Sequence, residues 1–183
     1  PIHEVFRHAV AARELAARCW ASLELADAPT DRRTGGGDSE LTPPKEWLSA
    51  SINHPAGRLA AFWVHAVQHD WRRAGDTYSG LDEQTKGVFD AMFAGRSRTH
   101  HLAQVRIASQ LHFLYGADPT WAAATLLPAL QWDDPGRAAR LWGGFILWGR
   151  WNDKLLDIGL LTAYRGAIEH HARLGYDELE ALI

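Results

Sequence analysis

Cysteine and methionine are almost absent from this sequence, with one residue of each among 183. The single thiol, Cys19, cannot form an internal disulfide, so the fold cannot rest on a disulfide framework and a reducing cytoplasm is the expected compartment. Cys19 falls within a helical apolar pattern, which predicts a small buried side chain. Because a chain of this length can bury a sizeable core without disulfides or metals, we expect one domain over residues 1–183.

Clustered positive charge and long apolar runs are also missing. The formal net charge is −3, and Arg32-Arg33 and Arg72-Arg73 are the only adjacent basic pairs, whereas nucleic-acid binding usually leaves a clustered basic footprint. The longest strongly apolar run, LWGGFILW at 141–148, is much shorter than the roughly 20 residues that span a bilayer. Neither nucleic acid nor a membrane is therefore expected as a partner, and no signal peptide opens the chain.

The two ends of the chain predict that it is a piece of a longer polypeptide. Pro1 stands where a natural protein would have Met, and the segment YDELEALI at 176–183 stops while its pattern is still helical. Any function is then expected to depend on the parent protein.

Alternating strand patterns are absent, and apolar residues recur at helical spacing instead. The polar, glycine-rich stretch at 28–41 has nothing to bury and predicts a flexible loop. We expect an all-α fold of seven to nine helices, arranged as a bundle or a short solenoid-like helical repeat, with no sheet. Helices are expected over 2–27, from the Thr42-Pro43 cap to 50, over 55–73, between Ser79 and Gly95, over 97–115, after Asp118-Pro119 and Asp134-Pro135, and over 151–174.

Sequence motifs for catalysis or cofactor binding are lacking. There is no G-x-S-x-G nucleophile turn, and TGGGD at 34–38 is followed by neither a Lys-Ser/Thr pair nor a helix, as a phosphate-binding loop would require. No cofactor is expected. The segment reads most simply as a non-enzymatic interaction or regulatory module that binds another domain of its parent chain or a protein partner, with homo-oligomerisation as a further option.

Histidines form the main candidate metal pattern. His65 and His69 lie four residues apart on one helical face, but the zincin pattern needs Glu where Ala66 stands. Structural histidines, with no metal between them, are therefore the favoured interpretation. The pair His69-Asp70 also resembles the signature of HD-type metal-dependent phosphohydrolases, with His3 or His8 upstream and Asp153 or Asp157 downstream as further ligands. This is the alternative function.

Nine tryptophans are the most unusual feature of the composition. One group falls among apolar helical positions and is predicted to anchor the core: Trp20, Trp63, Trp142 and Trp148. A second group falls near predicted helix ends, where a ring can pack while its N–H reaches a carbonyl or water: Trp47, Trp71, Trp132 and Trp151. A cluster of exposed aromatics would instead mark a partner surface.

The turn Asn53-His54-Pro55 predicts a corner between two helices, since the residue before proline is driven out of helical geometry. Asn53 or His54 can cap the second helix. Gly57 predicts close approach by a neighbouring helix or a ligand, and Arg58 is expected to pair with a carboxylate, because its charge faces the positive end of the helix dipole. A structural corner is favoured, and Asn53, His54 and Arg58 are the candidate binding residues if the corner is a ligand or partner site.

The segments INHPAGRLAAFW (52–63), LLPALQW (126–132) and WGGFILWGR (142–150) resemble an all-helical domain found C-terminal to sirtuin-like domains in bacterial proteins, some of them associated with defence against phage. The resemblance implies that NAD hydrolysis belongs to the sirtuin-like domain, and that the helical domain serves sensing, assembly or autoinhibition. No Rossmann glycine-rich turn occurs in the present residues.

Overall fold

Every element in the computed structural model is helical over the residues that it describes, 9–27 and 44–174, which confirms the predicted all-α class. The predicted loop at 28–41 and the Thr42-Pro43 cap lie outside the described residues.

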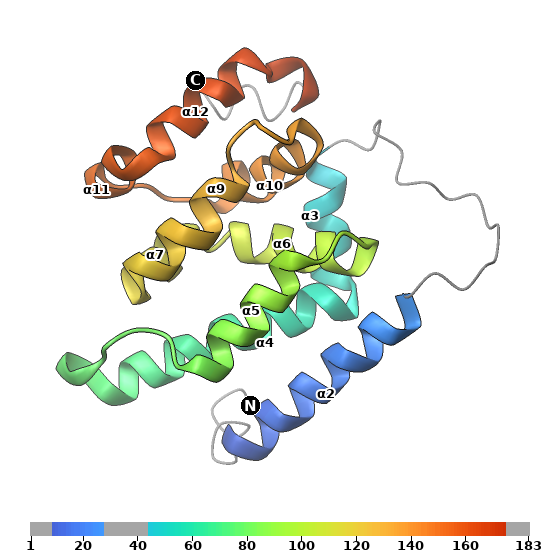
Figure 1. The fold of residues 1–183 in the computed structure, drawn as a ribbon, viewed down its shortest axis with the longest axis vertical. Coiled ribbons are helices and arrows are strands. Elements are labelled where there is room, and N and C mark those ends of the chain that lie inside the picture. The colour runs from blue at the N-terminus through green and yellow to red at the C-terminus, as the bar shows by residue number, and fades with distance from the viewer. Residues whose placement is uncertain (1–8, 28–43, 175–183) are drawn as a thin grey trace.

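The first half of the chain contains the longest helices. Its elements are α2 (Ala9–Asp27), α3 (Pro44–Asn53), α4 (Pro55–Ala74), the short helix η2 (Gly75–Thr77), α5 (Glu83–Ala94), α6 (Arg98–Ala108) and α7 (Leu111–Ala117). The second half is more broken. It comprises α8 (Pro119–Trp121), η3 (Ala122–Leu126), α9 (Leu127–Ala129), α10 (Pro135–Trp148), α11 (Asp153–Leu155), η4 (Leu156–Leu160), α12 (Leu161–Glu169) and η5 (His171–Arg173). Helix α2 lies at one end of the long axis and α11 and α12 lie at the other, while α3 lies beside α10 (Figure 1).

Helix α6 lies at the centre of the packing and contacts α3, α4 and α10 extensively, while α2 and α5 pack on the α4–α6 pair. Trp63 of α4 and Trp142 of α10 are both fully buried in this core. Trp20 is also buried, so three of the four predicted core tryptophans are confirmed. The prediction for Trp148 is wrong, because its residue is 60% exposed at the end of α10.

Helix α2 buries a different face from the one expected. Val10, Leu15 and Cys19 are exposed, and the prediction of a buried Cys19 is therefore wrong. The buried face carries Ala16, with Arg13 one turn before it and Trp20 one turn after it. Arg13 forms ion pairs with Asp70 and Asp82, so charge pairing selects this face over the more apolar one.

Helix starts were predicted well where an aspartate precedes a proline. The Asp118 side chain accepts a hydrogen bond from the backbone N–H of Trp121 at 2.9 Å, and Asp134 accepts one from Arg137 at 3.1 Å. The helix expected between Ser79 and Gly95 begins later than Ser79, because Asp82 caps α5 through the backbone N–H of Thr85 at 2.7 Å. A carboxylate is a stronger acceptor than a hydroxyl, and α5 begins accordingly at Glu83.

Two predicted helices are interrupted. The helix expected over 97–115 breaks after Ala108, where the Ser109 hydroxyl donates to the carbonyl of Arg106 at 2.7 Å and competes with the helical backbone pattern. The helix expected over 151–174 bends at Gly159, whose φ of 132° lies in the left-handed region that favours glycine. Among the described helices, none is long and apolar enough to cross a membrane.

Candidate functional site

The predicted corner between α3 and α4 is a structural turn. The Nδ1 atom of His54 accepts the backbone N–H of Ala56 at 3.2 Å, so His54 is the cap of α4. Asn53 turns back and donates to the carbonyl of Ser49 at 3.0 Å. Gly57 is buried against the backbone of Ser51, which confirms close packing by a neighbouring helix as the reason for the glycine.

The ion pair predicted for Arg58 is not formed with any carboxylate in the described part of the chain, and the Arg58 side chain is exposed. The prediction was wrong because α3 brings its backbone, rather than an acidic side chain, against the first turn of α4. Solvent can screen the unfavourable interaction of an exposed charge with the helix dipole.

His65 of α4 makes its contact within its own helix. The Nδ1 atom of His65 lies 2.6 Å from the carbonyl oxygen of Ala61, one turn earlier on the same helix. Asp70 forms its ion pair with Arg13, which occupies the carboxylate that the HD-type alternative would use for metal. Within residues 9–27 and 44–174, no group of three or more His, Cys, Asp or Glu side chains is arranged to hold a metal ion. His3 and His8 lie outside these ranges.

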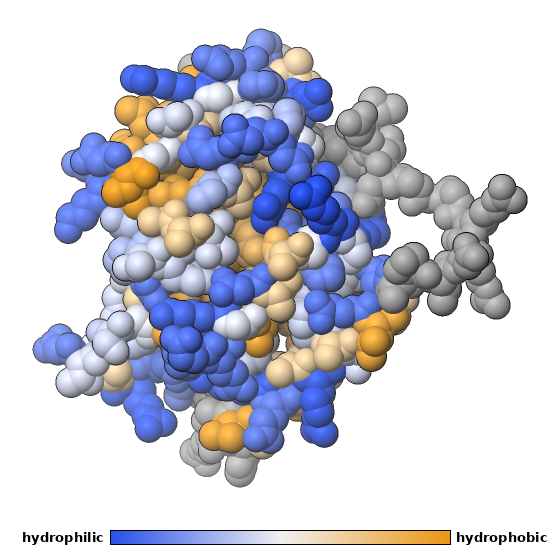
Figure 2. All heavy atoms as spheres, viewed as in Figure 1, coloured by the Kyte–Doolittle hydropathy of each residue, from blue (hydrophilic) through white to orange (hydrophobic). Residues whose placement is uncertain are grey.

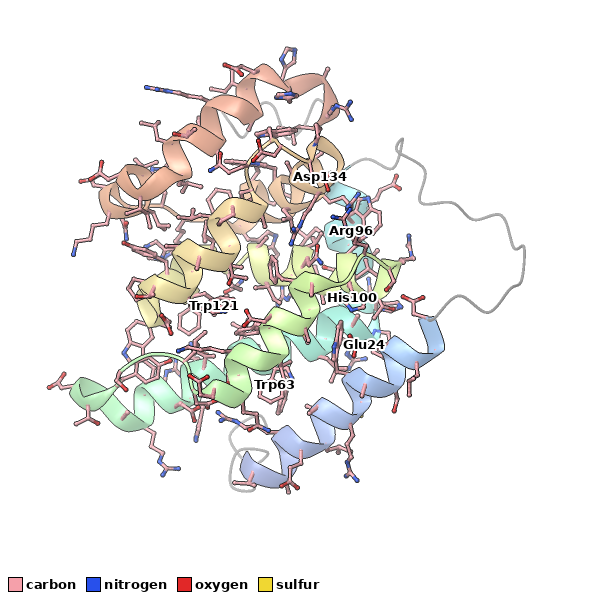
Figure 3. The ribbon with its side chains drawn as sticks, viewed as in Figure 1. Glu24, Trp63, Arg96, His100, Trp121 and Asp134 are labelled. Atoms are coloured by element: carbon pink, nitrogen blue, oxygen red, sulfur yellow. The ribbon has the colours of Figure 1, made fainter. Side chains whose placement is uncertain are left out.

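A polar cavity of about 420 Å³ lies between the end of α5 and the start of α10, and we call it the arginine pocket. Its charged lining consists of Arg96, Arg137, Arg140 and Asp134. Figure 3 labels Arg96 and Asp134 close together, and the most hydrophilic spheres on this face of Figure 2 gather at the same place. Positive charge therefore concentrates in one cavity of a chain whose net charge is negative.

Contacts with aromatic rings and polar groups hold two of these arginines in place. Arg137 donates to the carbonyl of Phe93 at 3.1 Å, and its guanidinium lies 5.6 Å from the centroid of the Phe93 ring. Arg140 lies 5.6 Å from the ring centroid of Trp47 and 3.3 Å from the Nε2 atom of His101. Such contacts reduce the entropy that a long side chain loses when it binds a ligand.

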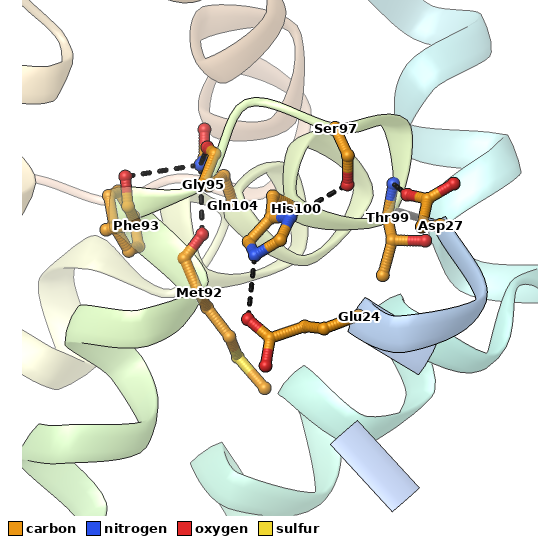
Figure 4. Close-up of polar contacts among 9 residues, drawn as sticks. All are labelled: Glu24, Asp27, Met92, Phe93, Gly95, Ser97, Thr99, His100 and Gln104. Carbon is orange, nitrogen blue, oxygen red and sulfur yellow. Dashed lines mark hydrogen bonds and ion pairs between the residues drawn. The ribbon is translucent and has the colours of Figure 1, made fainter. Parts of the chain in front are cut away.

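The wall of the arginine pocket is fixed by Gln104, which is buried in α6. Its amide nitrogen lies 2.9 Å from the carbonyl of Met92, 3.4 Å from that of Phe93 and 3.0 Å from that of Gly95 (Figure 4). These contacts satisfy carbonyls at the end of α5 that have no partner within the helix. The end of α5 is consequently held rigidly beside Arg137.

A second polar network joins α2 to the start of α6 (Figure 4). The two ring nitrogens of His100 lie 2.8 Å from the Ser97 hydroxyl and 3.0 Å from the Glu24 carboxylate. Asp27 accepts the backbone N–H of Thr99, and its hydrogen bond with Ser97 contributes most to lowering the pKa of its carboxyl. Ser97, His100 and Glu24 together resemble a Ser-His-Glu triad. However, Ser97 also forms a hydrogen bond with Asp27, and Ser97 and His100 both lie at the start of α6. The network therefore holds the start of α6 against α2, as a helix cap does.

A smaller cavity, of about 290 Å³, lies between α4 and α6 and is lined by His65 and Arg106. Burial lowers the pKa of Arg106, because its charged guanidinium loses surrounding water. Its described lining carries one permanent charge, where that of the arginine pocket carries several.

Apolar side chains are exposed mainly near the C-terminal end of the described chain. Six of these side chains fall within residues 147–168, are between 41% and 60% exposed, and are together called the C-terminal apolar face: Leu147, Trp148, Trp151, Ile158, Leu161 and Ile168. Leu161 and Ile168 lie two turns apart on one side of α12. Figure 2 shows orange spheres over α11 and the beginning of α12. Trp148 and Trp151, predicted to be a core anchor and a helix-end residue, both belong to this face.

Comparisons of the chain with profiles of known protein families, with curated proteins and with solved structures give no match. The candidate sites therefore rest on the geometry of the molecule. None of the residues predicted as binding residues lines the arginine pocket.

Proposed function

We propose that the chain is a helical interaction and regulatory module that binds another domain of its parent protein or a separate protein partner through the C-terminal apolar face. The observation that carries the proposal is the exposure of Trp148 and Trp151, at 60% and 59%. Tryptophan is enriched among the residues that contribute most to binding at protein interfaces, and two such side chains three residues apart are unusual on a free surface.

The arrangement of the rest of the molecule fits this role. The exposed side chains at 147–168 do not contribute to the buried core, which takes Leu155, Leu160 and Ala163 from the same stretch. In this proposal any catalytic step belongs to another domain, and the resemblance noted above makes a sirtuin-like NAD-hydrolysing domain the first candidate. The HD-type alternative is less well supported, because Asp70 is engaged by Arg13.

Chemical cross-linking in the cells that produce the natural protein tests the proposal. Lys154 is exposed in α11, within the stretch 147–168 that carries the C-terminal apolar face. Lys86 lies on α5, where it pairs with Glu83 and Asp118. An amine-reactive cross-linker should join Lys154, and not Lys86, to residues outside 1–183. Cross-links to outside residues that are equally frequent from both lysines would count against the C-terminal apolar face as the docking surface.

A further inference from the structure

The cavity of about 290 Å³ between α4 and α6 contains the guanidinium of Arg106, and we call it the Arg106 cavity. Arg106 has no hydrogen-bond or ion-pair partner among residues 9–27 and 44–174. Its neighbours on α6, Val105 and Ile107, are fully buried, so the side chain leaves the helix at the centre of the packing. Burial has removed part of its water, and a ligand anion would supply an acceptor in place of that water.

Polar side chains from both sides of the cavity lie in its lining with Arg106. His65 and Gln68 come from α4, one turn apart. The break after α6 places Gln110 there, and its amide nitrogen donates to the Ser109 hydroxyl at 3.3 Å. A carbonyl oxygen can only accept, so the Nδ1 atom of His65 donates to Ala61, and this bond fixes the ring. The cavity therefore combines a charged group with orienting amide and imidazole groups, as small-molecule sites do.

The rest of the described lining is apolar and consists of Ala61, Val64 and Phe113. A second cavity, of about 400 Å³, adjoins the first, because Gln68 and Phe113 line both. Trp71 lines the second cavity, and its ring centroid lies 5.8 Å from that of Phe113. The apolar part of a ligand would contact Phe113 in the first cavity, and Trp71 where it reaches the second.

We propose that the Arg106 cavity binds a small monocarboxylic acid, with its carboxylate on Arg106 and its apolar body against Phe113. The planar guanidinium presents paired N–H donors that match the two oxygens of a carboxylate. Arg106 is the one permanently charged side chain of the described lining, so it balances a single negative charge. Arg72 and Asp76 carry opposite charges in the adjoining cavity, which consequently adds no net charge to attract a second carboxylate.

The size of the cavity favours a compact ligand, because about 290 Å³ lies at the small end of the range for small-molecule sites. The inference does not depend on the proposed interaction through the C-terminal apolar face. The Arg106 cavity is lined from α4, α6 and the start of α7, and none of these helices carries a residue of that face.

Calorimetric titration of the whole chain with phenylpropionate and with octanoate tests the proposal. Arg106→Gln removes the charge and should raise the Kd about tenfold or more, as expected for the loss of a charge-assisted hydrogen bond. The variant should keep its melting temperature, because Arg106 has no partner in the described chain to lose. Arg165→Gln makes the same charge change on the exposed side of α12 and should leave the Kd unaltered.

A neutral probe tests the carboxylate without any substitution. Phenylpropionamide has the same body as phenylpropionate but no charge, and it should bind the unsubstituted chain about tenfold more weakly or less tightly still. Binding of either acid with this preference supports the proposal. The tighter of the two acids then identifies the body of the ligand as an aromatic ring or an alkyl chain.

Absence of binding by both acids would overturn the proposal. So would equal binding of the acid and its amide, or an equal loss of affinity in Arg106→Gln and Arg165→Gln, because the Arg106 guanidinium would then not hold the carboxylate. Acetate that binds as tightly as both longer acids would also contradict the proposal, since the apolar lining would then contribute nothing.

Discussion

An ideal Cβ atom placed on Gly57 would lie 1.9 Å from the carbonyl oxygen of Ser51. The first turn of α4 and the end of α3 thus meet backbone to backbone, with no room for a side chain between them. Real Cβ atoms do not approach an oxygen this closely, and a backbone oxygen inside a helix cannot move aside cheaply. This contact explains why a glycine stands one turn inside a helix.

Replacement of Gly57 with alanine should therefore destabilise the fold strongly. Forcing a methyl group into a packed contact costs about 1–3 kcal/mol, and we expect the upper end of this range because the obstacle is backbone. Urea unfolding followed by circular dichroism measures the change in the free energy of unfolding.

Gly87→Ala is the matched control for that experiment. Gly87 lies in the interior of α5, and a Cβ atom there would meet nothing within 4 Å. The substitution should raise stability by about 0.5–1 kcal/mol, since alanine has the better helix propensity. Similar effects of Gly57→Ala and Gly87→Ala would contradict the backbone contact.

Gln104→Met should lower the free energy of unfolding by about 1–3 kcal/mol, the cost of leaving buried polar groups unsatisfied. Methionine fills a similar volume but cannot donate to the carbonyls of Met92, Phe93 and Gly95. Thermal or chemical denaturation measures the loss. A fully stable variant would show that water satisfies these carbonyls and that Gln104 does not fix the wall of the arginine pocket.

Tyr78 should ionise only in strong alkali. Burial, and then the nearby carboxylates of Asp70, Asp118 and Asp82, raise the pKa of Tyr78 to about 12. Because the folded pKa lies above the unfolded value near 10, the stabilising contribution is complete below about pH 10 and is lost as the pH rises toward 12. Ultraviolet titration of the phenols should show a last-ionising component that Tyr78→Phe removes. A titration curve whose alkaline end is unchanged in that variant would refute the assignment.

Signals that act within a few residues were predictable from the sequence. Asp118 and Asp134 cap helices, and His54 ends the turn before α4, because each capping side chain needs only neighbouring backbone N–H groups. The close packing at Gly57 was also predictable from the sequence. A glycine inside a helix is unfavourable, so its presence indicates that another segment lies close to it.

Features that depend on distant contacts were not predictable. The exposed face of α2, including Leu15 and Cys19, follows from the pairing of Arg13 with Asp70, 57 residues away. The arginine pocket unites Arg96 with Arg137, which are 41 positions apart in the sequence, so scattered basic residues gave no sign of a local concentration of charge. The only local indication of the arginine pocket in the sequence was the pair Arg137 and Arg140, which lie one turn apart at the start of a helix.

Hydroxyl-radical footprinting is the most direct test of whether the C-terminal apolar face binds another protein surface. Trp148 and Trp151 should oxidise rapidly in the isolated chain, where they are 60% and 59% exposed. Both should be protected in the natural protein inside cells, while Leu25, 78% exposed on α2, should react equally in the two settings. Buried Trp63 provides the unreactive reference. Equal oxidation of Trp148 and Trp151 in the isolated chain and in cells would contradict the claim.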